Sequence, residues 1–446
     1  MGTVASKRSA WTVGSGHRPR GDVYWERSFE LRAESKNSQT RFLHHESNGV
    51  AVRTRRDSQD LFQAFTFEPG NLSPLTPVVD ADPQVRDLID GGRDRIQWLS
   101  SAEPMTVDRL AAVRGAGEVL AGFDDAICGS PVDGGRCTVR IQSRQFAVSC
   151  SDGRVDDDQC LTIHVTARAY SGAVRGFASA ASASLADLTA ETGRRIALTA
   201  ADQAAQLRQA RPPRSGPRTV IFAPRAAGVL IHEVIGHALE ADAAIRGSAL
   251  WRDRGNRFTH PELAIADDAH AAGAWSVARI DEEGVPLRRT PLVESGAAIG
   301  LVTDCLGAER LEHSGSTGHG RRGSHRRPPE SRLRHTAVEA GEDDLDAMIA
   351  DAADGLLVER VDSGEARVDD GEFIMRVAKA RDVTRGVLGD HRGAFTVYGN
   401  LSDFANLDAI GTRSEPHHSM CGRGGTWLPV SGSTPALRLP RLAVHG

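Results

Sequence analysis

The sequence predicts an α+β protein in two parts. Its first half contains segments of alternating apolar and polar residues, which is the period of a half-buried strand, and two segments whose apolar residues recur at helical spacing. The proline-rich segment RPPRSGP (211–217) cannot continue the second helix, and shorter strand-like runs follow it. We therefore expect an N-terminal α+β domain over residues 23–215 and a C-terminal domain over residues 216–446, with residues 1–22 disordered.

Four strands and two helices are expected in the first half. The alternation predicts strands at residues 23–34, 49–56, 137–150 and 160–170. Asn48-Gly49 is a turn pair typical of hairpins, so the first two strands should form a hairpin around it. The acidic stretch 151–159 should join the other two strands. The helices are expected at residues 107–123 and 184–210.

The second half is expected to begin with a buried strand and a helix. TVIFAP (219–224) is a short apolar run, and AAGVLIHEVIGHALEAD (226–242) has the length and apolar spacing of a helix. From about residue 260 onward, short strand-like runs alternate with glycines and acidic turns. This texture predicts a part with few long helices.

The composition excludes several classes of protein. Of the 446 residues, 40% are hydrophobic and 25% are charged, which excludes disordered and fibrous proteins. A formal net charge of −5 gives no reason to expect nucleic acid or an anionic membrane as partner. No apolar run approaches the roughly 20 residues of a membrane span. Six cysteines without a CxxC pair do not indicate a disulfide framework, so we expect a cytoplasmic protein.

The strongest chemical motif is HEVIGH, at residues 232–237. His232 and His237 offer neutral nitrogen ligands to a borderline metal such as zinc, and Glu233 could activate a water molecule. Histidines five residues apart point about 140° apart on an ideal α-helix and cannot share a metal there. The pair can meet only if the helix is bent or widened by a π-type bulge, and Gly236 is a residue type that tolerates such a distortion.

The residues alone leave two interpretations of this motif open. The segment could be an ordinary buried amphipathic helix, although a glutamate buried there without a partner would be costly. A catalytic metal site needs a third protein ligand, and the candidates are distant Cys, His, Asp and Glu side chains. Glu240 and Asp242 could orient an imidazole from outside the coordination sphere, or they could be solvated carboxylates at the helix end.

A glycine- and arginine-rich segment offers a competing motif. Residues 318–323 match GxGxxG, but Arg-Arg-Pro-Pro follows, and this cannot open the helix that a dinucleotide site requires. The six arginines of residues 319–334 could contact RNA phosphates, but they lack interleaved aromatic residues. Pairing with the acidic run at residues 342–372, within the chain or with a partner, is the simpler interpretation.

Four ordered segments resemble the TldD/PmbA family, in its metal-bearing, TldD-like branch. They are AAGVLIHEVIGHALEAD (226–242), DDAHAAGAWSVARIDEEGVPLRRTPLVESG (267–296), STGHGRRGSHRRPPESRLRHTAVEAGE (316–342) and MCGRGGTWLPVSGSTPALRL (420–439). The resemblance implies an N-terminal α+β domain followed by a largely β C-terminal domain that carries the metal. It also implies a zinc-dependent peptidase in which His232, His237 and Cys421 bind Zn²⁺ and Glu233 is the general base.

The same resemblance implies a partner and a substrate. We expect a heterodimer with a metal-less PmbA-like (TldE-like) paralogue, or a homodimer, whose site opens into an enclosed chamber. Such a chamber admits unfolded peptides, among them ribosomally made natural-product precursors, and neither nucleic acid nor membrane is expected as partner. A non-catalytic subunit with a structural metal, and a metal hydrolase of a non-peptide amide, are the alternatives.

Some residues near these motifs depart from the family pattern or compete with its ligands. The first forty residues lack the usual opening helix, His319 stands where asparagine is more common, and Gly323 stands where an acid is common. His417 and His418 precede Cys421 closely enough to compete as ligands, although the resemblance supports the cysteine. The glycine-rich stretch around residues 422–425 could bind an extended peptide as an added strand.

Overall fold

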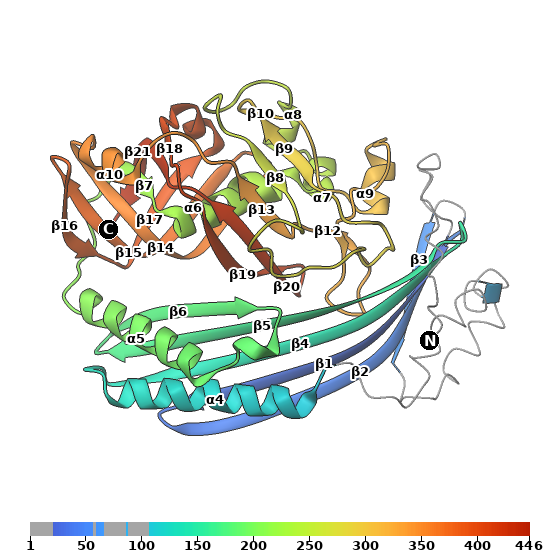
Figure 1. Ribbon diagram of the computed structural model, residues 1–446. Helices are drawn as coiled ribbons and strands as arrows, with labels where there is room; N and C mark the ends of the chain where they lie inside the picture. The colour runs from blue at the N-terminus through green and yellow to red at the C-terminus, as the bar shows by residue number, and fades with distance from the viewer. Residues whose placement is uncertain (1–20, 57–58, 67–85, 88–106) are drawn as a thin grey trace, which may run out of the picture.

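Six long antiparallel strands form a curved sheet in the first half of the computed structural model, which describes residues 21–56, 59–66, 86–87 and 107–446 (Figure 1). The strands, paired in the order β3-β2-β1-β4-β5-β6, are β1 (Gly21–Lys36), β2 (Gln39–Arg56), β3 (Gln59–Thr66), β4 (Gly134–Cys150), β5 (Val155–Ser171) and β6 (Val174–Ser182). The four strands expected from alternation correspond to β1, β2, β4 and β5, each longer than expected. Because β1 begins at Gly21, the last two residues of the segment expected to be disordered lie in a strand, and residues 1–20 lie outside the described residues.

Two helices, α4 (Arg109–Cys128) and α5 (Ala190–Leu207), cover one face of this sheet (Figure 1). The side chains of Asp108 and Thr189 cap their first turns by accepting backbone N–H groups, which the end of a helix leaves unpaired. Alternation along the strands sends every second side chain toward the helices. The apolar core formed there includes Phe29, Leu31, Val119, Phe123, Ile141 and Ile196.

The hairpin between β1 and β2 turns at Asn37 and Ser38. Both residues are left-handed, with φ of 50° and 63°, as a two-residue hairpin loop requires. The turn expected at Asn48-Gly49 is therefore wrong, since both residues lie inside β2. A Cβ on Gly49 would lie 2.1 Å from the ring of His325, so this glycine makes room for a distant segment.

Five strands of the second half close into a ring, because β14 pairs with both β7 and β15. The ring runs β14-β7-β21-β17-β15, β16 extends it beside β15, and β18 pairs with β21. These strands are β7 (Gly216–Phe222), β14 (Asp354–Ala366), β15 (Glu372–Thr384), β16 (Val387–Arg392), β17 (Phe395–Asn400), β18 (Ala409–Ile410) and β21 (Leu437–His445). The strand expected at residues 219–224 corresponds to β7, so that prediction is confirmed.

A second sheet of this half carries Cys421 on its last strand. Its strands, in the order β10-β9-β8-β13-β20-β19, are β8 (Ile265–Asp267), β9 (Thr290–Glu294), β10 (Ala297–Ala298), β13 (His335–Val338), β19 (Glu415–Arg423) and β20 (Thr426–Thr434). Within the part of the chain that the structure describes, β19 pairs only with β20. The strand with Cys421 is therefore an edge strand.

Short elements connect these sheets. They are α6 (Pro224–Ile231), α7 (Ala241–Ile245), α8 (Ala249–Arg252), α9 (Cys305–Arg310), α10 (Leu345–Ala350), the strand pair β11 (Gly320–Arg321) and β12 (Glu330–Ser331), a π-helical turn over His232–Gly236, and 3₁₀ turns over Leu185–Asp187, His237–Leu239 and Leu401–Asn406. None of the helices in the described ranges is long and apolar enough to cross a membrane. Strands dominate the second half, so the expected α+β fold with a largely β second part is confirmed.

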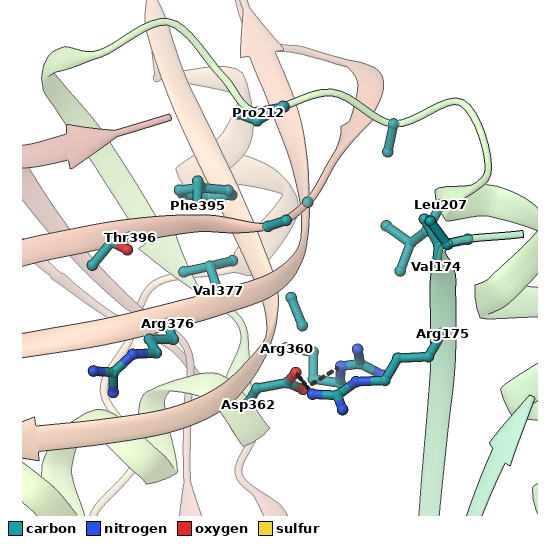
Figure 2. A pocket seen from close by; sticks show the side chains of 15 residues that line it. Val174, Arg175, Leu207, Pro212, Arg360, Asp362, Arg376, Val377, Phe395 and Thr396 are labelled. Carbon is teal, nitrogen blue, oxygen red and sulfur yellow. Dashed lines mark hydrogen bonds and ion pairs between the residues drawn. The ribbon is translucent and has the colours of Figure 1, made fainter. Parts of the chain in front are cut away.

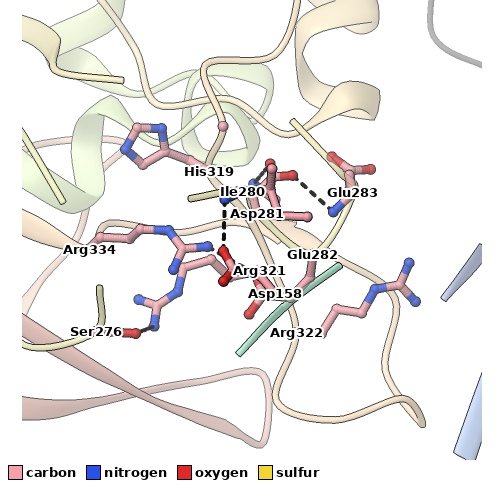
Figure 3. A network of polar contacts seen from close by, with 12 residues as sticks. Asp158, Ser276, Ile280, Asp281, Glu282, Glu283, His319, Arg321, Arg322 and Arg334 are labelled. Atoms are coloured by element: carbon pink, nitrogen blue, oxygen red, sulfur yellow. Dashed lines mark hydrogen bonds and ion pairs between the residues drawn. The ribbon is translucent and has the colours of Figure 1, made fainter. Parts of the chain in front are cut away.

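A buried ion network joins the two halves on the sheet face opposite α4 and α5, and Figure 3 shows its second-half members Glu282, Glu283, Arg322 and Arg334. We define it by the buried residues Asp22, Glu26, Arg53 and Arg144 of the first half and Glu282, Glu283, Arg322 and Arg334 of the second. Arg144 reaches Glu26 at 2.7 Å and Glu282 at 3.2 Å, and Arg334 reaches Glu282 at 2.9 Å. Each carboxylate meets an arginine, as burial of charge demands.

Four arginines of the arginine-rich segment contribute to this buried region, whereas Arg326 and Arg327 are exposed. Arg321, Arg322, Arg332 and Arg334 are all at most 3% exposed. Among the described contacts, none of these four reaches the acidic run 342–372. The expected pairing of the two segments within the chain is therefore wrong for these four arginines, because each has partners elsewhere in the chain. Arg322, Arg332 and Arg334 meet carboxylates, and Arg321 donates to carbonyls.

A cavity of about 560 Å³ opens between the end of α5 and the ring of strands (Figure 2). Leu207 and Phe395 contribute apolar surface to its wall, and Arg175 and Arg360 both reach Asp362, at 2.9 and 3.4 Å. None of the candidate metal ligands lines this cavity. It is therefore separate from the site described next.

Candidate metal centre

The helix that carries HEVIGH widens at the motif. α6 begins at Pro224, whose fixed φ suits the first helical position, and the π-helical turn follows directly after Ile231. The backbone N–H of His237 donates to the carbonyl of His232, five residues back instead of four. The two imidazoles consequently share one side of the helix, with ring centroids 4.7 Å apart. Of the two distortions that the histidine spacing allowed, a bend or a π-type bulge, the structure has the bulge.

Gly236 serves this turn by leaving space. Its angles, φ −57° and ψ −59°, are open to any residue, so the turn does not use the backbone freedom of glycine. A Cβ on Gly236 would lie 2.6 Å from Cδ1 of Leu333. Gly236 is the residue expected to accommodate the turn, but it does so by packing and not by backbone freedom.

The third potential ligand comes from β19, which packs against α6. The side chain of Cys421 faces the helix, and its Sγ lies 3.3 Å from His237 Nε2. The ligand atoms of His232, His237 and Cys421 all lie within 4.8 Å of one another. Among the described residues, these three side chains form a group that could hold a metal ion.

The chemistry of this cluster fits a borderline metal ion. Two imidazole nitrogens and a thiolate are ligands that zinc favours, and three protein ligands leave one tetrahedral position for water or substrate. His232 is 6% exposed, and its Nε2 is buried without a hydrogen-bond partner. This nitrogen is therefore available to a metal ion, beside the imidazole of His237 and the sulfur of Cys421.

Without a bound metal, the surroundings of the cluster shift the pKa values of Cys421 and His237 in opposite directions. Burial raises the pKa of the Cys421 thiol, but the neighbouring His232 and His237 outweigh burial and bring that pKa to about 4. Burial lowers the pKa of His237, but Glu240 and Cys421 raise it well above its ordinary value. Both shifts favour the thiolate of Cys421, which is the form that binds metals.

Glu233 lies beside the ligand atoms. Its Oε2 is 3.8 Å from His237 Nε2, and its side chain is 23% exposed, so water can reach it. Burial raises the pKa of Glu233, although His232 and His237 oppose the shift. A carboxylate in this position, with a raised pKa, is suited to accept and return a proton.

Glu240 orients His237 from the side away from the thiolate. Its carboxylate is fully buried, and Oε2 lies 3.1 Å from His237 Nδ1. Burial raises the pKa of Glu240, but His237, Arg423 and Arg332 lower it to about 2. Of the two carboxylates considered from the sequence, Glu240 contacts the imidazole, whereas Asp242 pairs with Arg423.

Arg332 contacts the site and was not found by sequence reasoning. It is 2% exposed, and its Nη2 lies 3.1 Å from Cys421 Sγ and 3.3 Å from the Cys421 carbonyl. No local motif marks it, because Cys421 and Glu240, which it contacts, are far away in the sequence. In the sequence, Arg332 is only one of the six arginines of residues 319–334.

The other sequence candidates lie outside the cluster. The His417 ring sits over Gly228, whose Cβ would be 2.2 Å from it, and burial lowers the pKa of His417 to about 3. His418 Nε2 contacts the carbonyl of Gly273 at 3.1 Å. Residues 318–323 form a loop and part of β11, and no helix follows them, so the dinucleotide interpretation is excluded.

A buried His-His-Cys cluster with an adjacent glutamate, on an α+β fold, is typical of metal-dependent hydrolases. The family model of the PmbA/TldA metallopeptidase C-terminal domain matches residues 215–446. This match covers more than half of the chain, and the chain belongs to this metallopeptidase family. The resemblance to TldD/PmbA proteins is thereby confirmed.

Curated relatives and solved structures agree with this assignment. The chain is 29% identical to a metalloprotease TldD homolog of Haemophilus influenzae over 223 residues, which is 49% of this chain and 46% of that protein. It is 27% identical to a zinc metalloprotease TldD homolog of Saccharolobus solfataricus over 236 residues, or 52% and 53% of the two chains. The matched stretch thus spans about half the length of these relatives.

Two solved structures share the fold over nearly the whole chain. TldE from Thermococcus kodakarensis matches with a TM-score of 0.70 at 16% identity, covering 96% of each chain. A proposed modulator of a DNA gyrase from Thermotoga maritima matches with a TM-score of 0.73 at 17% identity, covering 95% of each. At such low identity these matches show the fold alone.

Proposed function

We propose that this chain is a zinc-dependent peptidase that cleaves unfolded or extended peptides. The observation that carries the proposal is the cluster of His232, His237 and Cys421 with Glu233 beside it. Zinc held by the three ligands would supply Lewis acidity, which lowers the pKa of a water molecule and polarises a peptide carbonyl. The names of the curated metalloprotease relatives support the same class of reaction.

Glu233 has the proton-transfer role in this proposal. Its carboxylate accepts a proton from the attacking water and gives it to the nitrogen of the leaving amine. The raised pKa of Glu233 suits it to hold that proton between the two transfers. Glu240 keeps the His237 ring in place through Nδ1, so Nε2 stays directed toward the cluster.

The edge strand β19 supports an extended substrate. In the described chain its outer edge has no strand partner, so a peptide can add there through main-chain hydrogen bonds and run past Cys421. Of the stretch 422–425 expected to bind the peptide, Gly422 and Arg423 lie in β19, and Gly424 and Gly425 form the turn to β20 with φ of 57° and 78°. We therefore assign the peptide to the strand before that turn, where main-chain binding gives weak side-chain selectivity and requires an unfolded substrate.

Replacing Glu233 by glutamine tests the catalytic role. The Glu233→Gln variant should keep its fold and metal but lose cleavage of an unstructured peptide by at least about 100-fold, because only proton transfer is removed. Glu339→Gln, on an exposed glutamate paired with Arg289, is the matched control and should cleave as the wild type does. Equal turnover by wild type and Glu233→Gln would favour a non-catalytic subunit with a structural metal.

A second subunit is part of the proposal, either a metal-less TldE-like paralogue or a second copy of this chain. Leu110 and Val113 of α4 are 68% and 41% exposed, and Phe42 of β2 is 42% exposed. Leu110, Val113 and Gly117 fall on one face of α4, and Phe42 lies 4.0 Å from the Cβ position of Gly117. These side chains therefore form one apolar surface suited to a partner.

Co-expression with such a paralogue tests the second subunit. The two chains should elute together in size-exclusion chromatography, and the complex should cleave an unfolded peptide but spare the same sequence in a folded protein. Leu110→Asp should weaken the complex, whereas Leu198→Asp, on the comparably exposed α5, should not. A monomeric chain that cleaves folded and unfolded substrates at similar rates would contradict the enclosed chamber.

We also propose a cytoplasmic location. All six cysteines are free, as is usual in a reducing compartment. A thiolate ligand is also best protected from oxidation there.

A further inference from the structure

Arg332 stands apart from the other buried arginines of its segment. Arg322 and Arg334 pair with carboxylates of the buried ion network, and Arg321 donates to the carbonyls of Leu333 and Pro429. Arg332 instead points one terminal nitrogen at the sulfur of a candidate metal ligand, at 3.1 Å. The proposed peptidase mechanism gives this contact no role.

We infer that Arg332 is a positioning residue of the metal centre, which holds Cys421 in place for the metal and ties it to Glu240. This inference rests on the proposed zinc site. It concerns a residue that contacts the candidate ligand Cys421 and is not a member of the ligand cluster. Its role is to hold the Cys421 thiolate in position for the metal.

The contacts of Arg332 connect two of the three ligands. One nitrogen, Nη2, donates to both the sulfur and the carbonyl of Cys421, which fixes the side chain and the backbone of β19 together. Nε of the same guanidinium lies 3.7 Å from Glu240 Oε1, and Glu240 Oε2 lies 3.1 Å from His237 Nδ1. A continuous path therefore runs from Cys421 through Arg332 and Glu240 to His237.

The planar fork of arginine suits this path, and lysine does not. A guanidinium can donate toward the thiolate and the carboxylate in two fixed directions, whereas an ammonium is a single point charge on a flexible stem. A buried thiolate also needs donors to offset its loss of hydration. Donors outside the coordination sphere orient metal ligands and tune the metal, and their removal typically lowers metal affinity by about 10–100-fold.

The test compares zinc and cobalt(II) binding by Arg332→Lys, Glu240→Gln and a matched control. Arg144→Lys is the control, because Arg144, like Arg332, is a buried arginine with two anionic partners, here Glu26 and Glu282, but lies in the ion network. Zinc affinity, measured by competition with a chelator, should fall about 10–100-fold in Arg332→Lys and Glu240→Gln and stay unchanged in Arg144→Lys. The thiolate-to-cobalt charge-transfer band should shift or weaken in the first two variants only.

Each outcome decides a different question. If Arg332→Lys binds zinc as the wild type does and shows the same cobalt band, Arg332 only fills space and the inference is wrong. If Arg144→Lys loses affinity equally, the effect is general destabilisation and the inference is also wrong. If the wild type itself binds neither metal, the proposed zinc site fails first. Circular dichroism of each variant shows that the fold is retained, and Glu240→Gln tests the same path should Arg332→Lys not fold.

Discussion

The metal centre and the buried ion network are both dense groups of buried polar side chains, yet the pKa of a glutamate shifts in opposite directions in the two. In the network, Arg144 and hydrogen bonds outweigh burial and lower the pKa of Glu26 to about 2, so charges are held fixed. In the metal centre, burial wins at Glu233 and raises its pKa, and His232 Nε2 has no partner. Buried polar atoms without a hydrogen-bond partner occur in both regions, at Arg322 Nε and Arg334 Nε in the network as well as at His232 Nε2. The metal centre differs in that three metal-ligating side chains converge there beside a carboxylate whose pKa burial raises.

The largest expected effect follows from removing the thiolate. Wild type should contain about one zinc ion per chain, and Cys421→Ser should lose it, because only two imidazoles remain. Cys305→Ser is the matched control, since Cys305 is equally buried but lies beside Glu283 in the network region. Elemental analysis of the purified proteins decides the matter, and unchanged zinc in Cys421→Ser would remove the cysteine from the proposed ligand set.

The sequence predicted the local part of the metal centre because the requirement was geometric. Histidines five residues apart can meet only if the helix is bent or widened, and the structure has a π-helical turn at His232–Gly236. Cys421 came from the family resemblance alone, since nothing in its own surroundings marks it. Glu240 could be proposed because it lies one turn beyond His237.

The features of the site and the fold that could not be predicted depend on contacts between segments far apart in the sequence. Arg332 acquires its role only when β19 and the segment before β13 meet. Gly49 was misinterpreted as a turn residue because its partner, His325, is unknowable from local sequence. Long alternating runs such as β4 and β5 were predicted well, since their pattern is local, but the closing of five strands into a ring has no local signature.

A smaller effect is expected from breaking the ion network at Glu26. A fall of the pKa from 4.5 to about 2 in the folded protein corresponds to about 3 kcal/mol of unfolding free energy above pH 4.5. This contribution is present above the unfolded pKa and is lost as the pH falls toward 2. Denaturant unfolding of wild type and Glu26→Gln at pH 7 and pH 3 should therefore show a difference that shrinks in acid.

The control for Glu26 is an exposed ion pair. Glu365 is 66% exposed where it meets Arg376, so Glu365→Gln should change the unfolding free energy by less than about 1 kcal/mol. Glu26→Gln should also retain zinc, because the network does not touch the three ligands. A difference between Glu26→Gln and wild type that stays constant between pH 7 and pH 3 would contradict the fixed-charge account of the network.

The smallest effect separates two explanations of Gly236. If the glycine only provides space, Gly236→Ala should cost about 1–3 kcal/mol through its clash with Leu333, and shortening that side chain in Leu333→Ala should remove most of this cost. The helical angles at Gly236 accept alanine, so in the Leu333→Ala background the change should be close to neutral. Denaturant unfolding of the four proteins in a double-mutant cycle gives the coupling energy. A full cost that persists without the Leu333 side chain would mean that the π-helical turn requires glycine for its backbone, as the sequence first indicated.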